Sequence, residues 1–196
     1  MNVQNNLLWE SGKSSDFLKN EKLSFDNDLT GIAHRRYNDW KLGKQNASII
    51  LRYTTGVFKD FYAPTLGADF SIKKLQYGDD SIKLQIWDLG SQDFLGQVRR
   101  GFYPGARGVV FMFDVTKRES LDALWQWKEE VDTHIHGYQI LIVANKTDLE
   151  KKRAISQDEG IAFAQKFGGK YMETSVKLND RVDDSFQAIA KMVMDA

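Results

Sequence analysis

Apolar and polar residues follow two different periods in the chain after residue 47. Residues 68–77 and 81–87 alternate between apolar and polar side chains, and Gly78-Asp79-Asp80 separates them, which predicts a β-hairpin. Residues 108–115 (G-V-V-F-M-F-D-V) and 139–144 (Q-I-L-I-V-A) are instead almost continuously apolar. Such runs are typical of strands that are buried on both faces of a parallel sheet.

Helical spacing marks the segments between these strands. Ser156-Gln157-Asp158-Glu159 has the form of a capping box, which opens a helix that runs to about Phe167. The other expected elements are a helix start at 47–53, helices at 121–131 and 182–194, and a short strand at 170–173. Because strands alternate with helices, we expect an α/β fold: a doubly wound, mostly parallel sheet with one antiparallel hairpin strand.

The first 46 residues do not share this pattern. They are polar and show no sustained periodicity, whereas regular strand and helix signals begin at residue 47. We therefore expect an atypical N-terminal segment at 1–46 and one α/β domain at 47–196. A length of 196 residues fits one domain with an extension.

Composition excludes several classes of function. Lys plus Arg equals Asp plus Glu at 27 each, and this zero net charge argues against a nucleic-acid or anionic-membrane binder. There is no cysteine, which excludes disulfides, thiol chemistry and a thiol-linked lipid anchor in this chain. No apolar run reaches the length of a membrane span and no signal peptide is visible. We expect a cytoplasmic monomer.

Asn145-Lys146-Thr147-Asp148 carries the clearest chemistry. It follows the buried strand predicted at 139–144. An aspartate there can accept from both the N1–H and the exocyclic amine of guanine, an edge that adenine lacks. The asparagine can bond N7, and the lysine stem can lie on the face of the base. The alternative is a simple helix-capping turn.

Five further stretches stand in order around this tetrapeptide. They are residues 62–70, 87–94, 103–106 (Y-P-G-A), 113–116 (F-D-V-T) and 173–177 (E-T-S-V-K). Together they resemble a small GTPase of the Ras superfamily, and most closely its Rab-type members, from about Ala47 to Ala196. The resemblance implies the small G-domain fold, GTP or GDP and Mg²⁺ as cofactors, and slow GTP hydrolysis that switches the protein between two states.

The resemblance also assigns residues to the phosphates and the metal. Thr65 would bind Mg²⁺ through its hydroxyl and the γ-phosphate through its backbone N–H. Asp88 would hold a water of the magnesium shell, and Gln92 would orient the attacking water. Taken alone, each has a plain alternative: a Pro-Thr turn, a strand-end aspartate with its own hydrogen bonds, and a solvated glutamine.

The residues assigned to the guanine base are Asn145, Lys146, Asp148, Ser175, Val176 and Lys177. Ser175 would orient Asp148, the backbone N–H of Val176 would meet guanine O6, and Lys177 would flank the base. The family usually has alanine at the position of Val176, but a backbone donor survives that change.

An aromatic patch is the expected contact for an effector protein, together with the switch regions. It would comprise Phe70, Trp87 and either Phe102 or Tyr103, and aromatic anchors are common at interfaces. The alternative is a satellite hydrophobic cluster.

Two departures put nucleotide binding by this chain in doubt. Ser91 stands where the family has the glycine of its second switch. The phosphate-loop motif G-x-x-x-x-G-K-[ST] falls on residues 40–47, which read W-K-L-G-K-Q-N-A. At the motif positions, Trp40 and Gln45 replace the glycines, Asn46 replaces the lysine and Ala47 replaces the magnesium-binding hydroxyl that a phosphate loop needs. The alternative function is therefore a pseudo-GTPase, an interaction module that no longer binds nucleotide.

The strand that should precede this loop is also degenerate. Residues 33–39 read A-H-R-R-Y-N-D, and burying unpaired charges at the centre of a sheet costs several kcal/mol each. Either residues 1–46 supply another strand, or the reading frame is shifted here. A one-nucleotide shift over residues 33–41 permits an apolar strand that ends on glycine at position 40. Reading the coding DNA across residues 33–48 in all three frames tests this hypothesis.

Overall fold

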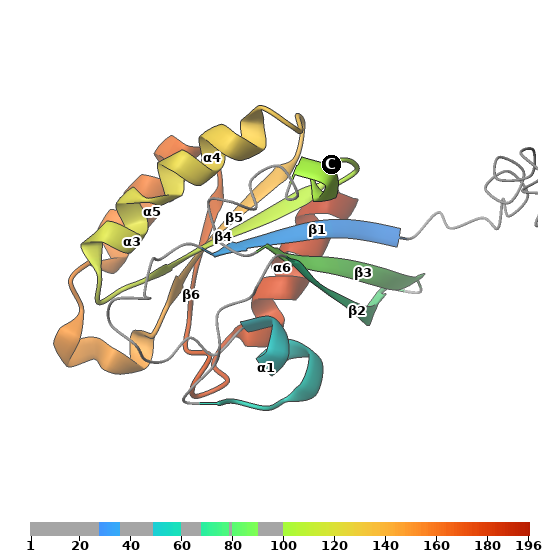
Figure 1. The fold of residues 1–196 in the computed structure, drawn as a ribbon. Helices are drawn as coiled ribbons and strands as arrows, with labels where there is room; N and C mark the ends of the chain where they lie inside the picture. The colour runs from blue at the N-terminus through green and yellow to red at the C-terminus, as the bar shows by residue number, and fades with distance from the viewer. Residues whose placement is uncertain (1–27, 36–48, 60–67, 79, 90–99) are drawn as a thin grey trace, which may run out of the picture.

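The computed structural model describes residues 28–35, 49–59, 68–78, 80–89 and 100–196. They form one six-stranded sheet in the order β2-β3-β1-β4-β5-β6, with helices on both faces (Figure 1). β2 (Ala68–Tyr77) runs antiparallel to β3 (Asp80–Leu89), and the other pairs are parallel. The small G-domain fold expected from the sequence is confirmed.

The centre of the sheet is filled by β1 (Asp28–Arg35), which pairs with β3 on one side and β4 (Gly108–Asp114) on the other. The strand therefore begins earlier than residue 33, where counting from the motifs placed it. The N-terminal segment supplies a central strand, which is the first of the two alternatives left open by the sequence.

Two hydrophobic clusters explain why β4 and β5 (Gln139–Asn145) are almost continuously apolar. Alternate residues of β4 point to opposite faces, so Val110 and Met112 join one cluster while Val109 and Phe111 join the other. β5 divides in the same way, and β6 (Lys170–Thr174) completes the sheet at its edge.

One face of the sheet is covered by α1 (Ile49–Thr55) and α6 (Val182–Met194), the last and most amphipathic helix. All four apolar positions that predicted α6 are buried: Val182, Phe186, Ile189 and Val193. The rings of Tyr53 and Phe186 stack at 3.9 Å between their centroids, which joins the two helices. Within the described helices, none is long and apolar enough to cross a bilayer.

The opposite face is covered by α3 (Arg118–Asp122), α4 (Leu124–Asp132) and α5 (Gln157–Phe167). The single helix predicted at 121–131 is interrupted at Ala123, whose backbone stays right-handed helical, so α3 and α4 form one broken helix. Ser156 caps α5 by accepting a hydrogen bond from the backbone N–H of Glu159 at 3.2 Å. The Glu159 carboxylate accepts from Arg118 on α3, at 2.9 Å from Nη2, so it ties two helices together.

Candidate functional site

The carboxyl ends of β4, β5 and β6 meet at one edge of the sheet. Asp114 lies opposite Asn145 in the β4–β5 register, and Asn145 lies opposite Thr174 in the β5–β6 register. Ligands of open α/β sheets bind outside the carboxyl ends of the strands. The sheet therefore brings together the residues that the sequence assigned to guanine.

Asn145 ends β5 and is 6% exposed. Its Oδ1 accepts hydrogen bonds from the backbone N–H of Val176 at 3.1 Å and from the Thr174 hydroxyl at 3.3 Å. The amide group is thereby fixed by the loop that follows β6. Because one oxygen anchors Asn145, its amide nitrogen is the atom that could meet a base acceptor such as N7.

Asp148 is oriented by Ser175, as the sequence predicted. The Ser175 hydroxyl donates to Asp148 Oδ1 at 2.7 Å and accepts from the backbone N–H of Leu178 at 3.1 Å. The Ser175 backbone is in turn paired with Asp180 through two hydrogen bonds of 3.1 and 2.9 Å. One carboxylate oxygen is thus fixed within the protein, and the other can face a ligand donor.

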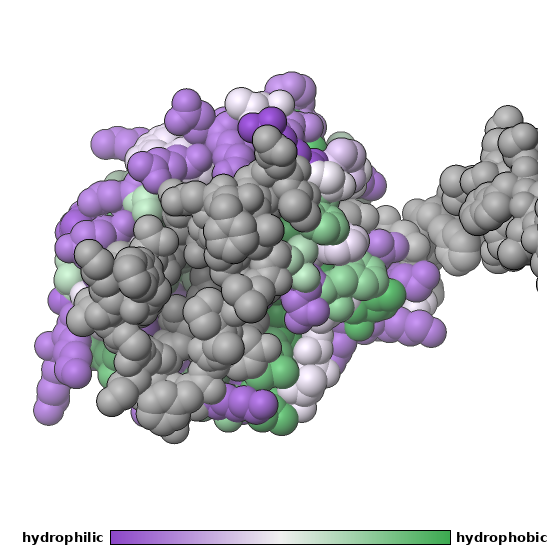
Figure 2. All heavy atoms as spheres, in the orientation of Figure 1, coloured by the Kyte–Doolittle hydropathy of each residue, from purple (hydrophilic) through white to green (hydrophobic). Residues whose placement is uncertain are grey.

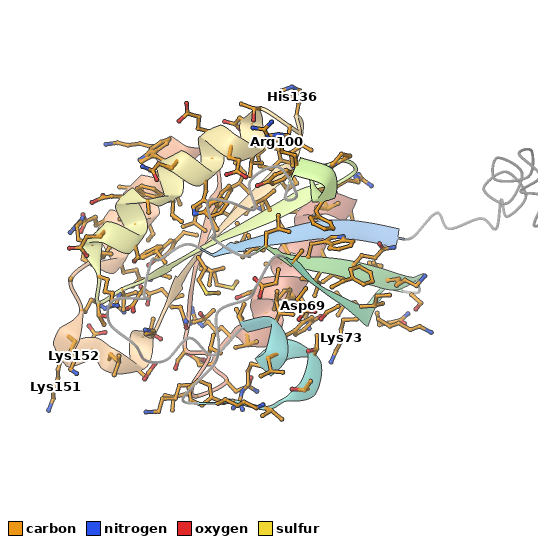
Figure 3. The ribbon with its side chains drawn as sticks, in the orientation of Figure 1. Asp69, Lys73, Arg100, His136, Lys151 and Lys152 are labelled. Atoms are coloured by element: carbon orange, nitrogen blue, oxygen red, sulfur yellow. The ribbon has the colours of Figure 1, made fainter. Side chains whose placement is uncertain are left out.

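The segment that follows β5 is held in place by Thr147, the first residue of η3 (Thr147–Lys152). Its hydroxyl donates to the backbone carbonyl of Thr174 at 3.0 Å. The loop therefore fastens the β5 side of the site to the β6 side. Beyond it, Lys151 and Lys152 extend outward from the molecule (Figure 3).

Lys146 has a partner that the sequence analysis did not assign. Its Nζ lies 2.7 Å from Asp114 Oδ2, and the two side chains are 26% and 13% exposed. Lys146 also has a left-handed backbone, with φ of 71°. Burial acts to raise the pKa of Asp114, but the hydrogen bonds from Lys146 and Thr116 outweigh it and hold that pKa below its ordinary value. The available signal was an aspartate that ends an apolar strand, inside the Phe113-Asp114-Val115-Thr116 motif.

Val176 and Lys177 follow β6 on the far side of the site. The Val176 side chain is 2% exposed and belongs to the cluster beneath α6, while Lys177 is exposed. The backbone N–H predicted to meet guanine O6 is directed at Asn145 Oδ1 in this structure. A bound guanine would share that donor with Asn145 or take it over.

Among the residues predicted to hold the metal and the phosphates, Asp88 is the one that the structure describes. Asp88 lies near the end of β3, opposite Ala33 of β1, and is 8% exposed. A buried carboxylate at a strand end suits Mg²⁺, which needs few protein oxygens because it keeps several waters. Thr65, Gln92, Ser91 and the degenerate loop at 40–47 lie outside the described residues.

The predicted aromatic patch is formed by Phe70, Trp87 and Phe102. The Trp87 ring lies 4.5 Å from Phe70 and 4.7 Å from Phe102, measured between centroids, and Phe70 is 41% exposed. Ile72, which the sequence analysis missed, is 50% exposed on the same strand as Phe70. Figure 2 shows hydrophobic side chains gathered over the β2–β3 hairpin.

Tyr103 does not belong to this patch. Of the two residues that the sequence offered as its third member, Phe102 is therefore correct and Tyr103 is wrong. Tyr103 is 0% exposed, donates its hydroxyl hydrogen to Glu130 Oε1 at 2.8 Å and stacks on His134 at 5.0 Å. A tyrosine held inside by a carboxylate and a ring cannot contact a partner. Phe102, its neighbour in η2 (Arg100–Phe102), packs beside Trp87 instead.

Comparison with known proteins gives a consistent family. The sequence model of the Ras family matches residues 39–195. The Ras-related protein RABC1 of Arabidopsis thaliana is 33% identical over 156 residues, covering 78% of this chain and 73% of the relative. The GTP-binding protein yptV2 of Volvox carteri is 34% identical over 154 residues, covering 78% and 71% respectively. The match to the family begins after β1.

Proposed function

The chain belongs to the Ras family as a Rab-like small GTPase, and from this premise we propose that it binds guanine nucleotide with Mg²⁺ and switches between GTP- and GDP-bound states. The observation that carries the proposal is the fixed geometry of the base-reading residues. Ser175 holds Asp148 at 2.7 Å, and the backbone of Val176 holds Asn145 at 3.1 Å. Both bonds are made by groups of the protein itself, so they reduce the cost of ordering the two side chains when a base binds.

Guanine selectivity follows from the hydrogen-bonding inventory of the site. A carboxylate only accepts hydrogen bonds, so Asp148 suits the N1–H and amine of guanine and repels the unprotonated N1 of adenine. Asn145 supplies an amide donor for N7, and the Lys146 stem covers the face of the base. Ser175 acts through Asp148, and Lys177 flanks the base from the other side.

The metal and the phosphates would be held from the β3 side. Asp88 would hold a water of the magnesium shell, and Thr65 would bind the metal and the γ-phosphate. Mg²⁺ supplies neutralisation of the charge on the phosphate oxygens. Gln92 would orient a water for slow hydrolysis of GTP to GDP. We propose that the Phe70, Trp87 and Phe102 patch binds an effector protein in the GTP state.

A second function is favoured by the sequence of residues 40–47 and by Ser91. A loop reading W-K-L-G-K-Q-N-A offers neither the successive glycine N–H groups nor the lysine that neutralise phosphate. In this alternative the chain is a pseudo-GTPase that meets its partner through the aromatic patch without nucleotide. The exposed Phe70 and Ile72 side chains are compatible with both functions.

Nucleotide competition separates the two functions. We expect GTP and GDP, but not ATP, to displace a fluorescent guanine nucleotide from the purified chain in Mg²⁺ buffer. Asp148→Asn replaces one acceptor with an amide donor, so it should weaken GDP binding and favour xanthosine diphosphate, whose C2 carries a carbonyl. Equal displacement by ATP would contradict guanine reading, and absence of binding to any nucleotide would establish the pseudo-GTPase.

A further inference from the structure

Asp114 is a partly buried charge at the candidate site to which the guanine-binding proposal gives no task. It ends β4 directly opposite Asn145, and Asn145 immediately precedes Lys146 in the sequence. Its two carboxylate oxygens have separate partners. Oδ1 accepts from the Thr116 backbone N–H at 2.9 Å and from the Thr116 hydroxyl at 2.7 Å, while Oδ2 faces the Lys146 ammonium at 2.7 Å.

The two bonds from Thr116 fix the direction of the carboxylate. When an aspartate oxygen accepts a hydrogen bond from the backbone N–H two residues later, it closes a local turn, which leaves the second oxygen little freedom. The backbone of Asp114 is fixed separately by Ser120, whose hydroxyl oxygen lies 3.0 Å from the Asp114 N–H and 2.6 Å from the Lys117 carbonyl. Asp114 is therefore a rigid anion rather than a flexible surface side chain.

Lys146 is the residue that needs such an anchor. Its left-handed backbone is uncommon for a side chain with a Cβ and starts the stem in a direction that ordinary helical or extended residues do not share. A lysine side chain has four rotatable bonds and loses much entropy when it is ordered. The ion pair with Asp114 fixes the far end of the stem before any ligand arrives.

We propose that Asp114 is a positioning residue for guanine binding: by holding the Lys146 ammonium, it sets the Lys146 stem in place as a platform for the base. This inference rests on the proposed function, since it concerns the same site. It adds Asp114, a residue of β4, to the residues that support recognition of the base, which otherwise lie in the tetrapeptide and in the loop after β6.

Binding measurements on three variants test the proposal. Asp114→Asn keeps the shape but removes the charge, and we expect about tenfold weaker binding of guanosine and GDP alike, since a hydrogen bond between charged groups is being lost. Lys146→Met keeps the apolar stem and removes the ammonium. In the Lys146→Met background, Asp114→Asn should cause no further loss, because the carboxylate acts through that ammonium.

Ser120→Ala is the matched control. It disturbs the backbone of the same loop but leaves the carboxylate and Lys146 untouched. If Asp114 only stabilised the loop, Ser120→Ala would weaken guanosine binding as much as Asp114→Asn does. In that case Asp114→Asn would also cause the same loss of affinity in the wild type as in the Lys146→Met background. Either result overturns the positioning role while leaving the proposed function intact.

A nucleotide-free readout keeps the two proposals distinguishable. Reductive methylation of lysines, followed site by site with mass spectrometry, reports how firmly the Lys146 ammonium is held. We expect slow methylation of Lys146 in the wild type and in Ser120→Ala, and several-fold faster methylation in Asp114→Asn. Equal rates in all three overturn the anchor. If the rates differ as expected but the wild type binds no guanosine or GDP, the proposed function fails and the ion pair alone stands.

Discussion

The guanine side and the phosphate side of this site differ in how completely the sequence builds them. On the guanine side, Asn145, Lys146 and Asp148 each have a partner within the protein, at distances between 2.7 and 3.3 Å. On the phosphate side, residues 40–47 carry neither the glycines nor the lysine at the positions that the phosphate-loop motif requires. Under the proposed function, this difference would make recognition of the base and binding of the phosphates separable in one small domain.

The separation has a structural basis in the order of the strands. The candidate base-reading residues lie at the ends of β5 and β6, on one side of β1, whereas the candidate metal residue Asp88 lies near the end of β3 on its other side. The contacts described above for Asn145, Lys146 and Asp148 are made with β4, β6 and the segment after β6. Under the proposed function, substitutions in residues 40–47 would therefore leave these contacts in place.

Restoring the phosphate loop should produce the largest change. The combined variant W40G/Q45G/N46K/A47S recreates the glycines, the lysine and the hydroxyl of the motif. We expect GDP to bind at least about a hundredfold more tightly, because a lysine and a hydroxyl gain charged partners, while guanosine binding stays unchanged. Calorimetric titration with both ligands checks this. An equal gain for guanosine would contradict the separation of the two halves.

Removing the hydrogen bond that supports Asp148 should weaken binding of the guanine base. Ser175→Ala deletes the donor to Asp148 and the acceptor for Leu178, and we expect about tenfold weaker binding of guanosine and GDP. The control is Ser185→Ala, which removes an equally buried serine on α6. Equal affinities for the Ser175 and Ser185 variants, measured by fluorescence titration, would show that the orientation of Asp148 does not matter.

A smaller effect is expected where the two halves are joined. Arg52 of α1 donates from Nε to Asn179 Oδ1 at 3.1 Å, a contact between the helix after residues 40–47 and the loop after β6. This bond is exposed, so Arg52→Ala should weaken guanosine binding only about two- to threefold. Arg107→Ala, which removes a bond to the far end of α6, should have no effect on the same titration. A tenfold loss with Arg52→Ala would mean that the halves are strongly coupled.

The smallest effect concerns the packing of α1. The Tyr53 hydroxyl is buried and has no hydrogen-bond partner among the described residues. Tyr53→Phe removes an unsatisfied polar group, so the free energy of unfolding should rise by up to about 1 kcal/mol. Urea unfolding at pH 7 measures it. A clear loss of stability would indicate that the hydroxyl has a partner.

The same variant has a signature at alkaline pH. Burial, together with the nearby Asp183 carboxylate, raises the pKa of Tyr53 from 10.0 to about 12. Between these values the unfolded phenol loses its proton while the folded one keeps it, so this contribution to stability declines as pH rises from 10 towards 12. Tyr53→Phe should remove that part of the decline. An unchanged slope in unfolding experiments would contradict the burial of the hydroxyl.

The sequence predicted most of the fold because its strongest patterns are local. The apolar runs of β4 and β5 can only be buried on two faces, and the three- and four-residue spacing of apolar positions in α6 defines a single buried stripe. β1 was misplaced because its residues, Asp28–Arg35, carry little periodicity and its position depends on pairing with β3 and β4. Such pairing is made between distant segments, and no local pattern records it.

The candidate site shows the same division. Asn145, Asp148 and Ser175 could be assigned from motifs, and the structure brings them together at the edge of the sheet. The sequence could not choose between Phe102, which ends η2, and Tyr103, which follows it, because only tertiary packing decides which of two adjacent aromatic residues is buried. The Asp114–Lys146 pair was missed because it joins the last residue of β4 to the residue that follows β5, two positions far apart in the sequence.

The most direct test of the account is a comparison of guanosine, GDP and ADP binding to the unmodified chain by calorimetry in Mg²⁺ buffer. The account predicts that guanosine and GDP bind with affinities within about tenfold of each other, because the base contributes most of the free energy, and that ADP does not bind. Tight binding of GDP with no measurable binding of guanosine would contradict it, since recognition would then lie in the phosphates.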